Sequence, residues 1–260
     1  MNSGQQLYIY GRRPVYEALR SAHTVFQVFL AENSSGKIIG KIKQQCTKKQ
    51  VPFDLIPKND LQKLVGPVVH QGVAALIEFN PFLSREAWQK LIEQKPDALL
   101  LITDQIQDAH NLGAILRTCE ISGVDCVVLP SKGSAPLNAT VAKTSSGALF
   151  HVQFHTADSL ENSLVHLQDN DFSVFATLPS AEQTIYQADF TGKTALIIGS
   201  EDKGVRKNLL PYCTHAVKIP QFGHVNSLNA SVSAAIVLYE AVRQRYFAGQ
   251  APNGNQMEKA

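Results

Sequence analysis

The chain has 260 residues, 44% of them hydrophobic and 18% charged, which is typical of a globular protein and excludes a largely disordered one. No run of about 18 apolar residues occurs and the N-terminal MNSGQQLYIYGRR lacks the apolar core of a signal peptide, so we expect a cytoplasmic protein without a membrane span. The four cysteines form no CxxC pair, and nothing in their spacing indicates a zinc site or a disulfide framework.

Residues 1–78 predict a small α/β domain. Apolar stretches alternate with amphipathic ones and predict these elements in chain order: a strand over 8–11, a helix over 14–22, a strand over 25–31, a helix over 34–49, and strands over 51–56 and 72–79. Such alternation is typical of a three-layer arrangement.

The same segment is basic. It holds ten Lys and Arg against five Asp and Glu, a net charge of +5, whereas the fourteen basic and seventeen acidic residues of the remainder give −3. A basic module suits nucleic-acid capture, because Lys and Arg neutralise phosphates and release counterions. A solvated basic face explains the composition equally well.

Residues 79–97 predict a linker that contains a short helix, and 98–248 predict a second α/β domain. Its elements are expected in this order: strand 98–104, helix 109–123, strand 126–130, helix 138–149, strand 151–155, helix 159–170, strands 172–178, 194–200 and 215–220, and helix 227–247. Strands this apolar belong to a parallel sheet with helices on both faces. Residues 249–260 predict a flexible tail.

Three segments carry more polar residues and glycines than a scaffold needs, and each follows or includes a predicted strand, where open parallel sheets place ligand sites. In the first, Asp108 is placed to cap a helix and Gly113 permits close backbone approach. Asn111 lies in the opening turn of that helix and Arg117 further along it. Taken singly, a helix-start Asn and a surface Arg explain both.

The second segment runs from an apolar strand into Gly-Ser-Glu-Asp-Lys-Gly, where Gly199 and Gly204 flank Glu201 and expose backbone N–H groups. It matches neither GxGxxG nor a P-loop, and a plain strand-to-helix turn is the alternative. In the third segment, a helix opens after Ser227 with Asn229, Ser231 and Ser233. A capping serine accounts for Ser227 but not for the cluster.

These segments, in this order, resemble the three motifs of the SpoU/TrmH branch of the SPOUT methyltransferases: NLGAILRTCEISGV, LIIGSEDKGV and KIPQFGHVNSLNASVSAAI. The intervening PLNATVAKTSSGAL and the N-terminal YIYGRRPVYEAL and HQGVAA are similar to the ribosomal-RNA guanosine enzymes of that family. The resemblance covers nearly the whole chain.

The resemblance implies a fold that periodicity does not give: a C-terminal α/β trefoil knot with a parallel sheet, in which the last helix threads a loop and forms the pocket for S-adenosylmethionine. It also implies a homodimer with active sites near the subunit interface, and an N-terminal α/β domain that is similar to a ribosomal RNA-binding protein. No metal is implied.

The resemblance further implies the site residues. Five would orient the nucleotide and stabilise its reacting oxygen: Asn111, Arg117, Glu201, Ser227 and Asn229. Four would hold the cofactor through backbone groups and apolar packing: Leu178, Gly199, Ile219 and Leu228. Arg12 and Arg13, in the basic segment, are expected to contact RNA.

The activity implied is 2'-O-methylation of a ribose, with guanosine in large-subunit (23S) ribosomal RNA as the substrate. Transfer RNA and an antibiotic-resistance site on ribosomal RNA are the alternative substrates, and an RNA-binding protein without catalysis is the alternative class. An arginine stays protonated at neutral pH, so we expect Arg117 to stabilise a developing alkoxide and not to act as a base.

Overall fold

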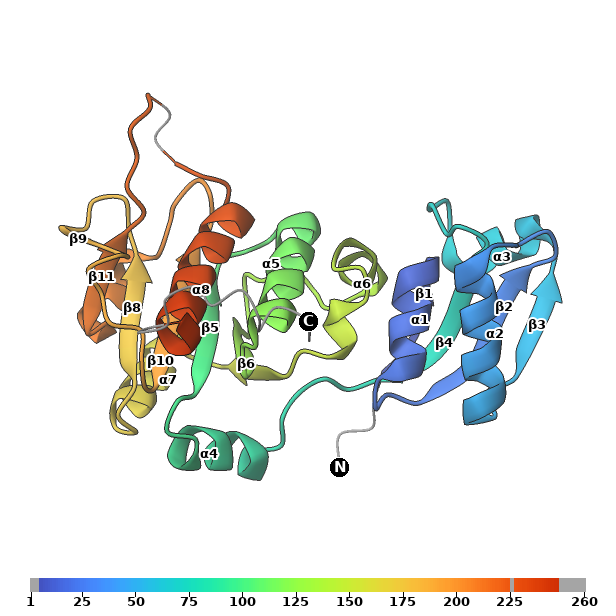
Figure 1. Cartoon of the computed structure of the whole chain (residues 1–260), viewed down its shortest axis with the longest axis horizontal. Coiled ribbons are helices and arrows are strands. Elements are labelled where there is room, and N and C mark those ends of the chain that lie inside the picture. Colours follow the sequence, from blue (N-terminus) through green and yellow to red (C-terminus); the bar gives the residue numbers. More distant parts are fainter. Residues whose placement is uncertain (1–4, 225–226, 248–260) are drawn as a thin grey trace.

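The computed structural model describes residues 5–224 and 227–247, which form two sheets with their helices (Figure 1). The N-terminal sheet has the strand order β1-β4-β2-β3, with β2 and β3 parallel and the other pairs antiparallel. Its elements are β1 (Gln5–Tyr10), α1 (Arg12–Arg20), β2 (Val25–Ala31), α2 (Lys37–Lys49), β3 (Phe53–Ile56), α3 (Lys58–Val65) and β4 (Val73–Phe79).

Alternate residues of β4 point to opposite faces of this sheet, as the two-residue period of a strand requires. Val73 and Ala75 lie in the core that includes residues of α1 and α2, whereas Ala74 packs with Leu61 of α3. The three predicted layers are therefore confirmed. The helix α3 that completes them was not predicted, because a single buried residue, Leu61, leaves almost no periodic signal.

Residues after β4 lead to α4 (Arg85–Gln94), the short helix expected between the two sheets. The hydroxyl of Ser84 accepts a hydrogen bond from the backbone N–H of Ala87 and caps this helix. Trp88 is buried, and its ring stacks on His155 with centroids 4.0 Å apart. The connection is thus packed against the larger sheet.

The C-terminal sheet has the strand order β7-β6-β5-β10-β8-β11-β9, and all its pairings are parallel. Its strands are β5 (Leu99–Asp104), β6 (Cys126–Pro130), β7 (Phe154–Ala157), β8 (Ser173–Thr177), β9 (Gln183–Thr184), β10 (Thr194–Gly199) and β11 (His215–Lys218). Its helices are α5 (Ala109–Ser122), α6 (Ala139–Thr144), η1 (Ala148–Phe150), α7 (Leu160–Gln168), η2 (Lys207–Tyr212) and α8 (Ala230–Phe247).

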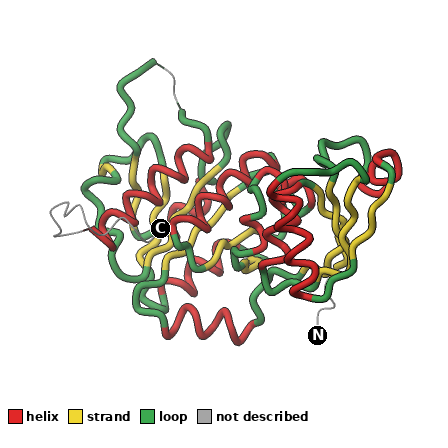
Figure 2. The backbone as a smooth tube through the Cα atoms, turned by 45° about the vertical axis from the view of Figure 1, so that its right-hand side comes forward, coloured by secondary structure: helices red, strands yellow, loops and turns green. Residues whose placement is uncertain are grey.

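Helices cover both faces of this sheet, which confirms the predicted α/β class (Figure 2). Leu99 and Leu101 face the side of α5 and α8, and Leu100 and Ile102 face the side of α7. Within the described residues, no helix is long and apolar enough to cross a membrane.

Two predicted elements were wrong in their bounds. The helix expected over 138–149 is broken, because Ser146 and Gly147 adopt φ of 56° and 93° between α6 and η1. A Cβ at Gly147 would lie 2.7 Å from the Cβ of Glu17 and 3.2 Å from the Cα of Pro14, so the break lets α1 approach the turn. The strand expected over 151–155 lies later in the chain, as β7 (Phe154–Ala157). The tail expected over 249–260 lies outside the described residues.

The two sheets share one hydrophobic core where α1 meets α6 and η1. The rings of Phe79 and Phe150, one from each side, meet edge to face with centroids 5.9 Å apart. The ammonium group of Lys143 donates a hydrogen bond to the side-chain oxygen of Gln71 at 2.7 Å. The N-terminal sheet is therefore docked on the C-terminal one and does not hang from a free linker.

Candidate active site

Three of the expected site residues come from loops at the carboxyl ends of neighbouring strands. Asn111 lies in the first turn of α5, after β5; Glu201 follows β10; and Asn229 directly precedes α8. The strands β5, β10, β8 and β11 are consecutive in the sheet, so the loops after them converge at one edge.

The side chains of these three residues form one hydrogen-bonded network. Oε1 of Glu201 accepts from Nδ2 of Asn111 at 3.0 Å, from Nδ2 of Asn229, and from the backbone N–H of Ala230 at 3.3 Å. Nδ2 of Asn229 also donates to Oδ1 of Asn111 at 2.9 Å. A carboxylate that accepts several N–H groups fixes the orientation of both amides.

Helix caps hold the two amides in place. Oδ1 of Asn229 accepts from the backbone N–H of Ser231 at 2.9 Å and of Val232 at 3.3 Å, so Asn229 caps α8. Asp108 caps α5, as predicted, by accepting from the backbone N–H of Asn111 at 3.2 Å. Both residues are thus held at the start of a helix, Asn229 by its side chain and Asn111 by its backbone.

The loop that carries Glu201 is tied down by a buried carboxylate. Asp104, at the end of β5, is fully buried and accepts from the backbone N–H of Arg206 at 2.8 Å and from its Nε at 2.7 Å. A Cβ at Gly199 would collide with the backbone of Gly204, so the loop closes on itself only with glycine there. Asp104 was not among the predicted site residues, although an acidic residue that ends an apolar strand is a usable signal.

A cavity of about 430 Å³ lies on one side of this loop. Its walls come from the segments after β8, β10 and β11. All four residues expected to bind the cofactor line it, and so does Ser227: Leu178, Gly199, Ile219, Leu228 and Ser227. Thr177 also lines the cavity, and its hydroxyl is buried without a hydrogen-bond partner among the described residues. Such a group points to an absent polar ligand.

A second cavity of about 330 Å³ lies on the other side of the same loop. Asn111 and Gln105 line it, and Ser200 to Lys203 belong to both cavities. Glu201 therefore lies in a wall between two spaces, one of which is lined by the residues expected to bind the cofactor. Two reactants bound on either side of this wall would lie close to each other.

Arg117 is not part of this network. It lies on the exposed surface of α5 and lines a different cleft, together with Arg13 of α1. Arg12 turns to the N-terminal sheet, where its Nε donates to the carbonyl oxygen of Gln71 at 3.1 Å. One copy of the chain brings Asn111, Glu201 and Asn229 together, with Ser227 nearby, but leaves Arg117 apart.

The helix α8 presents an apolar face to solvent. Val232, Tyr239 and Tyr246 follow one another at intervals of seven residues and are 45%, 52% and 64% exposed. The opposite face packs on α5 and β10. A helix that is apolar on its exposed side as well as its buried side indicates a contact with another molecule.

Known proteins match the chain in both parts. Residues 98–239, which are more than half of the chain, match the SpoU rRNA Methylase family. The chain belongs to the SpoU rRNA methylase family. Residues 8–83 match the substrate-binding domain of RNA 2'-O ribose methyltransferases. Together the two matches make this SpoU-family chain an RNA methyltransferase.

Relatives of the family match over almost their full length. A putative TrmH family tRNA/rRNA methyltransferase of Staphylococcus aureus (strain COL) is 35% identical over 243 residues, which is 93% of this chain and 98% of the relative. The corresponding protein of Staphylococcus epidermidis is 36% identical over 251 residues, 93% of this chain and 97% of the relative.

Solved structures of the family share the fold. The crystal structure of an RNA 2'-O ribose methyltransferase has a TM-score of 0.75 and 27% identity, and the match covers 93% of this chain and 89% of that one. The SpoU methyltransferase AviRb from Streptomyces viridochromogenes, solved in complex with the cofactor AdoMet, has a TM-score of 0.76 at 22% identity, and the match covers 92% and 90% of the two chains.

Proposed function

We propose that the chain transfers the methyl group of S-adenosylmethionine to the 2'-hydroxyl of a guanosine in large-subunit (23S) ribosomal RNA. The observation that carries this proposal is that Glu201 lines both cavities and holds Asn111 and Asn229 in one network. A methyl donor in one cavity and a ribose in the other would both lie beside Glu201.

The first cavity fits S-adenosylmethionine in size and chemistry. Its volume of about 430 Å³ lies in the range of small-molecule sites. Leu178, Ile219 and Leu228 offer apolar surface for an adenine ring, and the Thr177 hydroxyl offers a buried polar group that has no partner among the described residues. When bound, the cofactor supplies an electrophilic methyl group.

The protein contributes orientation to the reaction. Oε1 of Glu201 is occupied by three N–H donors, while its Oε2 has no hydrogen bond to any described residue and can accept one from a ribose hydroxyl. Asn111 is held by both of its amide atoms and cannot rotate freely. Alignment of two reactants supplies about 7–11 kcal/mol of a reaction barrier, so positioning is the main contribution.

The cationic group of the site comes from a second copy of the chain. Arg117 lies outside the network, yet the oxygen that attacks the methyl group gains negative charge and needs a cation. The exposed apolar face of α8, with Val232, Tyr239 and Tyr246, offers the surface for a homodimer. Arg117 of the partner subunit would then reach the site, fully protonated, and stabilise the developing alkoxide.

The arrangement of the last strand and helix supports a trefoil knot, in which α8 passes through a loop of the chain. The cavity is lined by residues from parts of the chain that are distant in sequence, 177–180, 198–205, 219–221 and 227–230, and a threaded helix would hold them together. The domain boundaries at 78 and 98 and the cytoplasmic location stay predictions, as do the RNA contacts of Arg12 and Arg13.

Ribosomal RNA is favoured as the substrate by the extent of the likenesses. The A. aeolicus TrmH/SpoU tRNA modifying enzyme covers only 61% of this chain, at 29% identity and a TM-score of 0.52, whereas the RNA 2'-O ribose methyltransferase covers 93%. A basic N-terminal module suits a large structured RNA. The Staphylococcus relatives are named for both tRNA and rRNA, so the same chemistry on transfer RNA is the second candidate.

The experiment is a methyl-transfer assay with tritiated S-adenosylmethionine and separate pools of ribosomal and transfer RNA, followed by mapping of 2'-O-methyl sites. Glu201→Ala serves as the inactive variant and Lys90→Ala, on the exposed surface of α4, as the matched control. Label at a guanosine of 23S RNA, lost with Glu201→Ala, supports the proposal. Label at an antibiotic-resistance site or in transfer RNA changes the substrate, and no label with intact RNA binding indicates a binding protein.

A further inference from the structure

A cleft of about 510 Å³ lies between α1 of the N-terminal sheet and α5 of the C-terminal one. We name it the α1–α5 cleft; the residues that matter to its chemistry are Arg13, Arg20, Arg117, Glu120, Ser146 and His151. It belongs to neither of the two cavities beside Glu201. Its walls come from both matched segments, 8–83 and 98–239.

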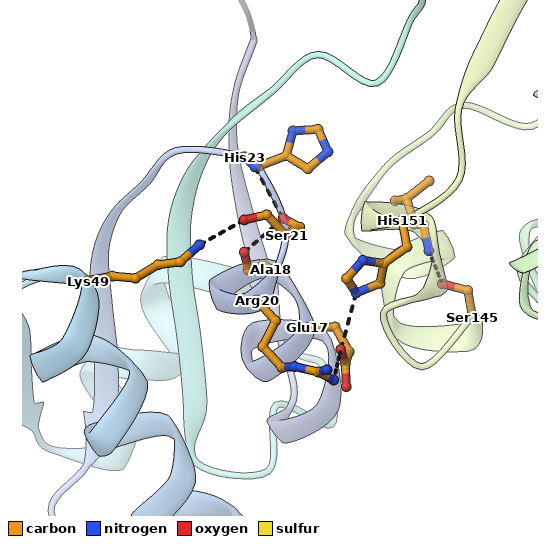
Figure 3. A network of polar contacts seen from close by, with 9 residues as sticks. Glu17, Ala18, Arg20, Ser21, His23, Lys49, Ser145 and His151 are labelled. Atoms are coloured by element: carbon orange, nitrogen blue, oxygen red, sulfur yellow. Dashed lines mark hydrogen bonds and ion pairs between the residues drawn. The ribbon is translucent and has the colours of Figure 1, made fainter. Parts of the chain in front are cut away.

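The floor of the cleft is a fixed contact between the two sheets' helices (Figure 3). Oε2 of Glu17 on α1 accepts from Nη1 of Arg20 at 3.1 Å and lies 3.1 Å from Nε2 of His151. Gly147 allows α1 to pack directly on the turn that precedes His151, because any Cβ there would clash with Glu17. The spacing of the cleft walls is therefore set by close packing.

Positively charged side chains outnumber negatively charged ones among the residues that line the cleft. Glu17 is already shared by Arg20 and His151, whereas Arg13 and Arg117 form no ion pair within residues 5–224 and 227–247. Glu120, on the α5 side, is the one further carboxylate among the lining residues. The cleft therefore holds three guanidinium groups against two carboxylates, and such an excess of guanidinium groups favours an anionic ligand with several oxygens.

Ser146, which also lines this cleft, has a strained backbone conformation. Its φ of 56° lies in the left-handed region, which residues other than glycine, asparagine and aspartate rarely adopt. Ser146 lines the cleft together with the three arginines, and its hydroxyl forms no hydrogen bond with the described part of the chain. Backbone strain of this kind gathers where a side chain serves a ligand.

We propose that the α1–α5 cleft binds a phosphate group of the RNA backbone, held by Arg13 and Arg20 from α1 and by the Ser146 hydroxyl. The inference rests on the proposed function, since it assigns a place to the same substrate. The phosphate belongs to the stretch of RNA between the part captured by the N-terminal sheet and the target nucleotide. Arg117 lines the same cleft and, in the proposed dimer, also reaches the target nucleotide in the site of the partner subunit.

The sharpest test compares Ser146→Asp with Ser146→Asn in the full-length chain. Both residues tolerate a positive φ and have nearly the same shape, so the two variants differ mainly in one negative charge. Dissociation constants for a 23S RNA transcript are measured at about 50 and about 200 mM salt. We expect Ser146→Asp to bind RNA about fivefold more weakly than Ser146→Asn at the lower salt and almost equally at the higher one.

A second pair of variants tests Arg20 against an arginine outside the cleft. Arg20→Gln is expected to lower the slope of log Kd against log salt by about 0.7 to 0.9, the loss of one phosphate contact. Arg85→Gln, at the exposed start of α4 and outside the cleft, leaves the slope unchanged. Binding of S-adenosylmethionine, measured by calorimetry, stays the same in all four variants and reports that they are folded.

The outcomes separate the two proposals. If the wild-type chain methylates RNA but Ser146→Asp and Arg20→Gln bind it like their controls at both salt concentrations, the proposal that the cleft binds phosphate is overturned and the proposed function stands. If the wild-type chain binds S-adenosylmethionine but neither binds nor methylates RNA, the proposed function and the cleft fail together.

Discussion

The carboxylate of Asp104 accepts both the backbone N–H and the guanidinium Nε of Arg206, at 2.8 and 2.7 Å. The two residues end β5 and the loop after β10, and the pair holds this loop over the edge of the sheet. The side chain of Asp104 has no solvent exposure, whereas that of Arg206 is 33% exposed. The carboxylate therefore depends on the arginine more than the arginine depends on the carboxylate.

Removal of Arg206 should destabilise the protein strongly. Arg206→Ala leaves Asp104 buried with one backbone donor, and we expect the free energy of unfolding to fall by about 3 kcal/mol. Arg85→Ala, an exposed arginine on α4, should change it by less than about 0.5 kcal/mol. Urea unfolding measures both. Equal stability of the two variants would show that the buried carboxylate does not need the guanidinium.

Two helical glycines should respond to alanine with opposite signs. A Cβ at Gly113 of α5 would lie 2.7 Å from the Cβ of Thr144 and 2.9 Å from the backbone nitrogen of Ser145, so Gly113→Ala forces α5 and α6 apart and destabilises the protein. Gly40 of α2 has open space around it, and Gly40→Ala should stabilise by about 0.5 to 1 kcal/mol. Thermal unfolding of both variants measures these effects. A Gly113→Ala protein as stable as the wild type would contradict the close contact between α5 and α6.

Mixed dimers should reveal that Arg117 acts across the subunit interface. Arg117→Ala and Glu201→Ala are each expected to be inactive alone. After both proteins are unfolded and refolded together in equal amounts, half of the dimers carry one variant of each kind, with one intact site out of two, so about one quarter of wild-type methylation returns. No return of activity, with mixed dimers shown by mass spectrometry, would place Arg117 in its own subunit's site.

Acid should weaken the protein through His23. Burial lowers the pKa of His23 below its ordinary value, and the nearby His151 lowers it further. The unfolded chain then binds a proton near pH 6.5 that the folded chain does not, so the free energy of unfolding falls as the pH drops below about 6.5.

The matched variant for this effect is His23→Phe, which keeps an aromatic ring against Phe79 and Phe150 but cannot titrate. Burial also lowers the pKa of His70 and His155, so we expect the pH dependence to become shallower and not to vanish. Urea midpoints between about pH 7 and pH 5 test this. An unchanged pH dependence in His23→Phe would refute the assignment.

Sequence patterns located the elements that bury a periodic face and missed those that do not. The strand over 98–104 was predicted because it opens with five consecutive apolar residues, and β5 confirms it. The short β9 and the 3-10 helix η2 lack any such period. The break after α6 could not be predicted, because it depends on the contact of Gly147 with α1, which is distant in sequence.

The candidate site divides in the same way. Asn111, Glu201 and Asn229 were expected to act together, and the order of β5, β10 and β11 in the sheet places them within hydrogen-bond distance. The separate position of Arg117 follows from the direction in which α5 turns its exposed surface, which residue spacing alone did not settle. Ser227 lines the cavity without a role that the structure distinguishes.

The strand order of the C-terminal sheet has a consequence for synthesis of the chain on the ribosome. The strand β10 lies between β5 and β8, and Leu99 pairs with Thr194. The N-terminal sheet closes once Phe79 has emerged, but the centre of the larger sheet stays open until Gly199 follows. During that interval β5 exposes two apolar faces and unpaired backbone groups. Pairings this distant in sequence form slowly, so the nascent chain is most prone to aggregation while this half is incomplete.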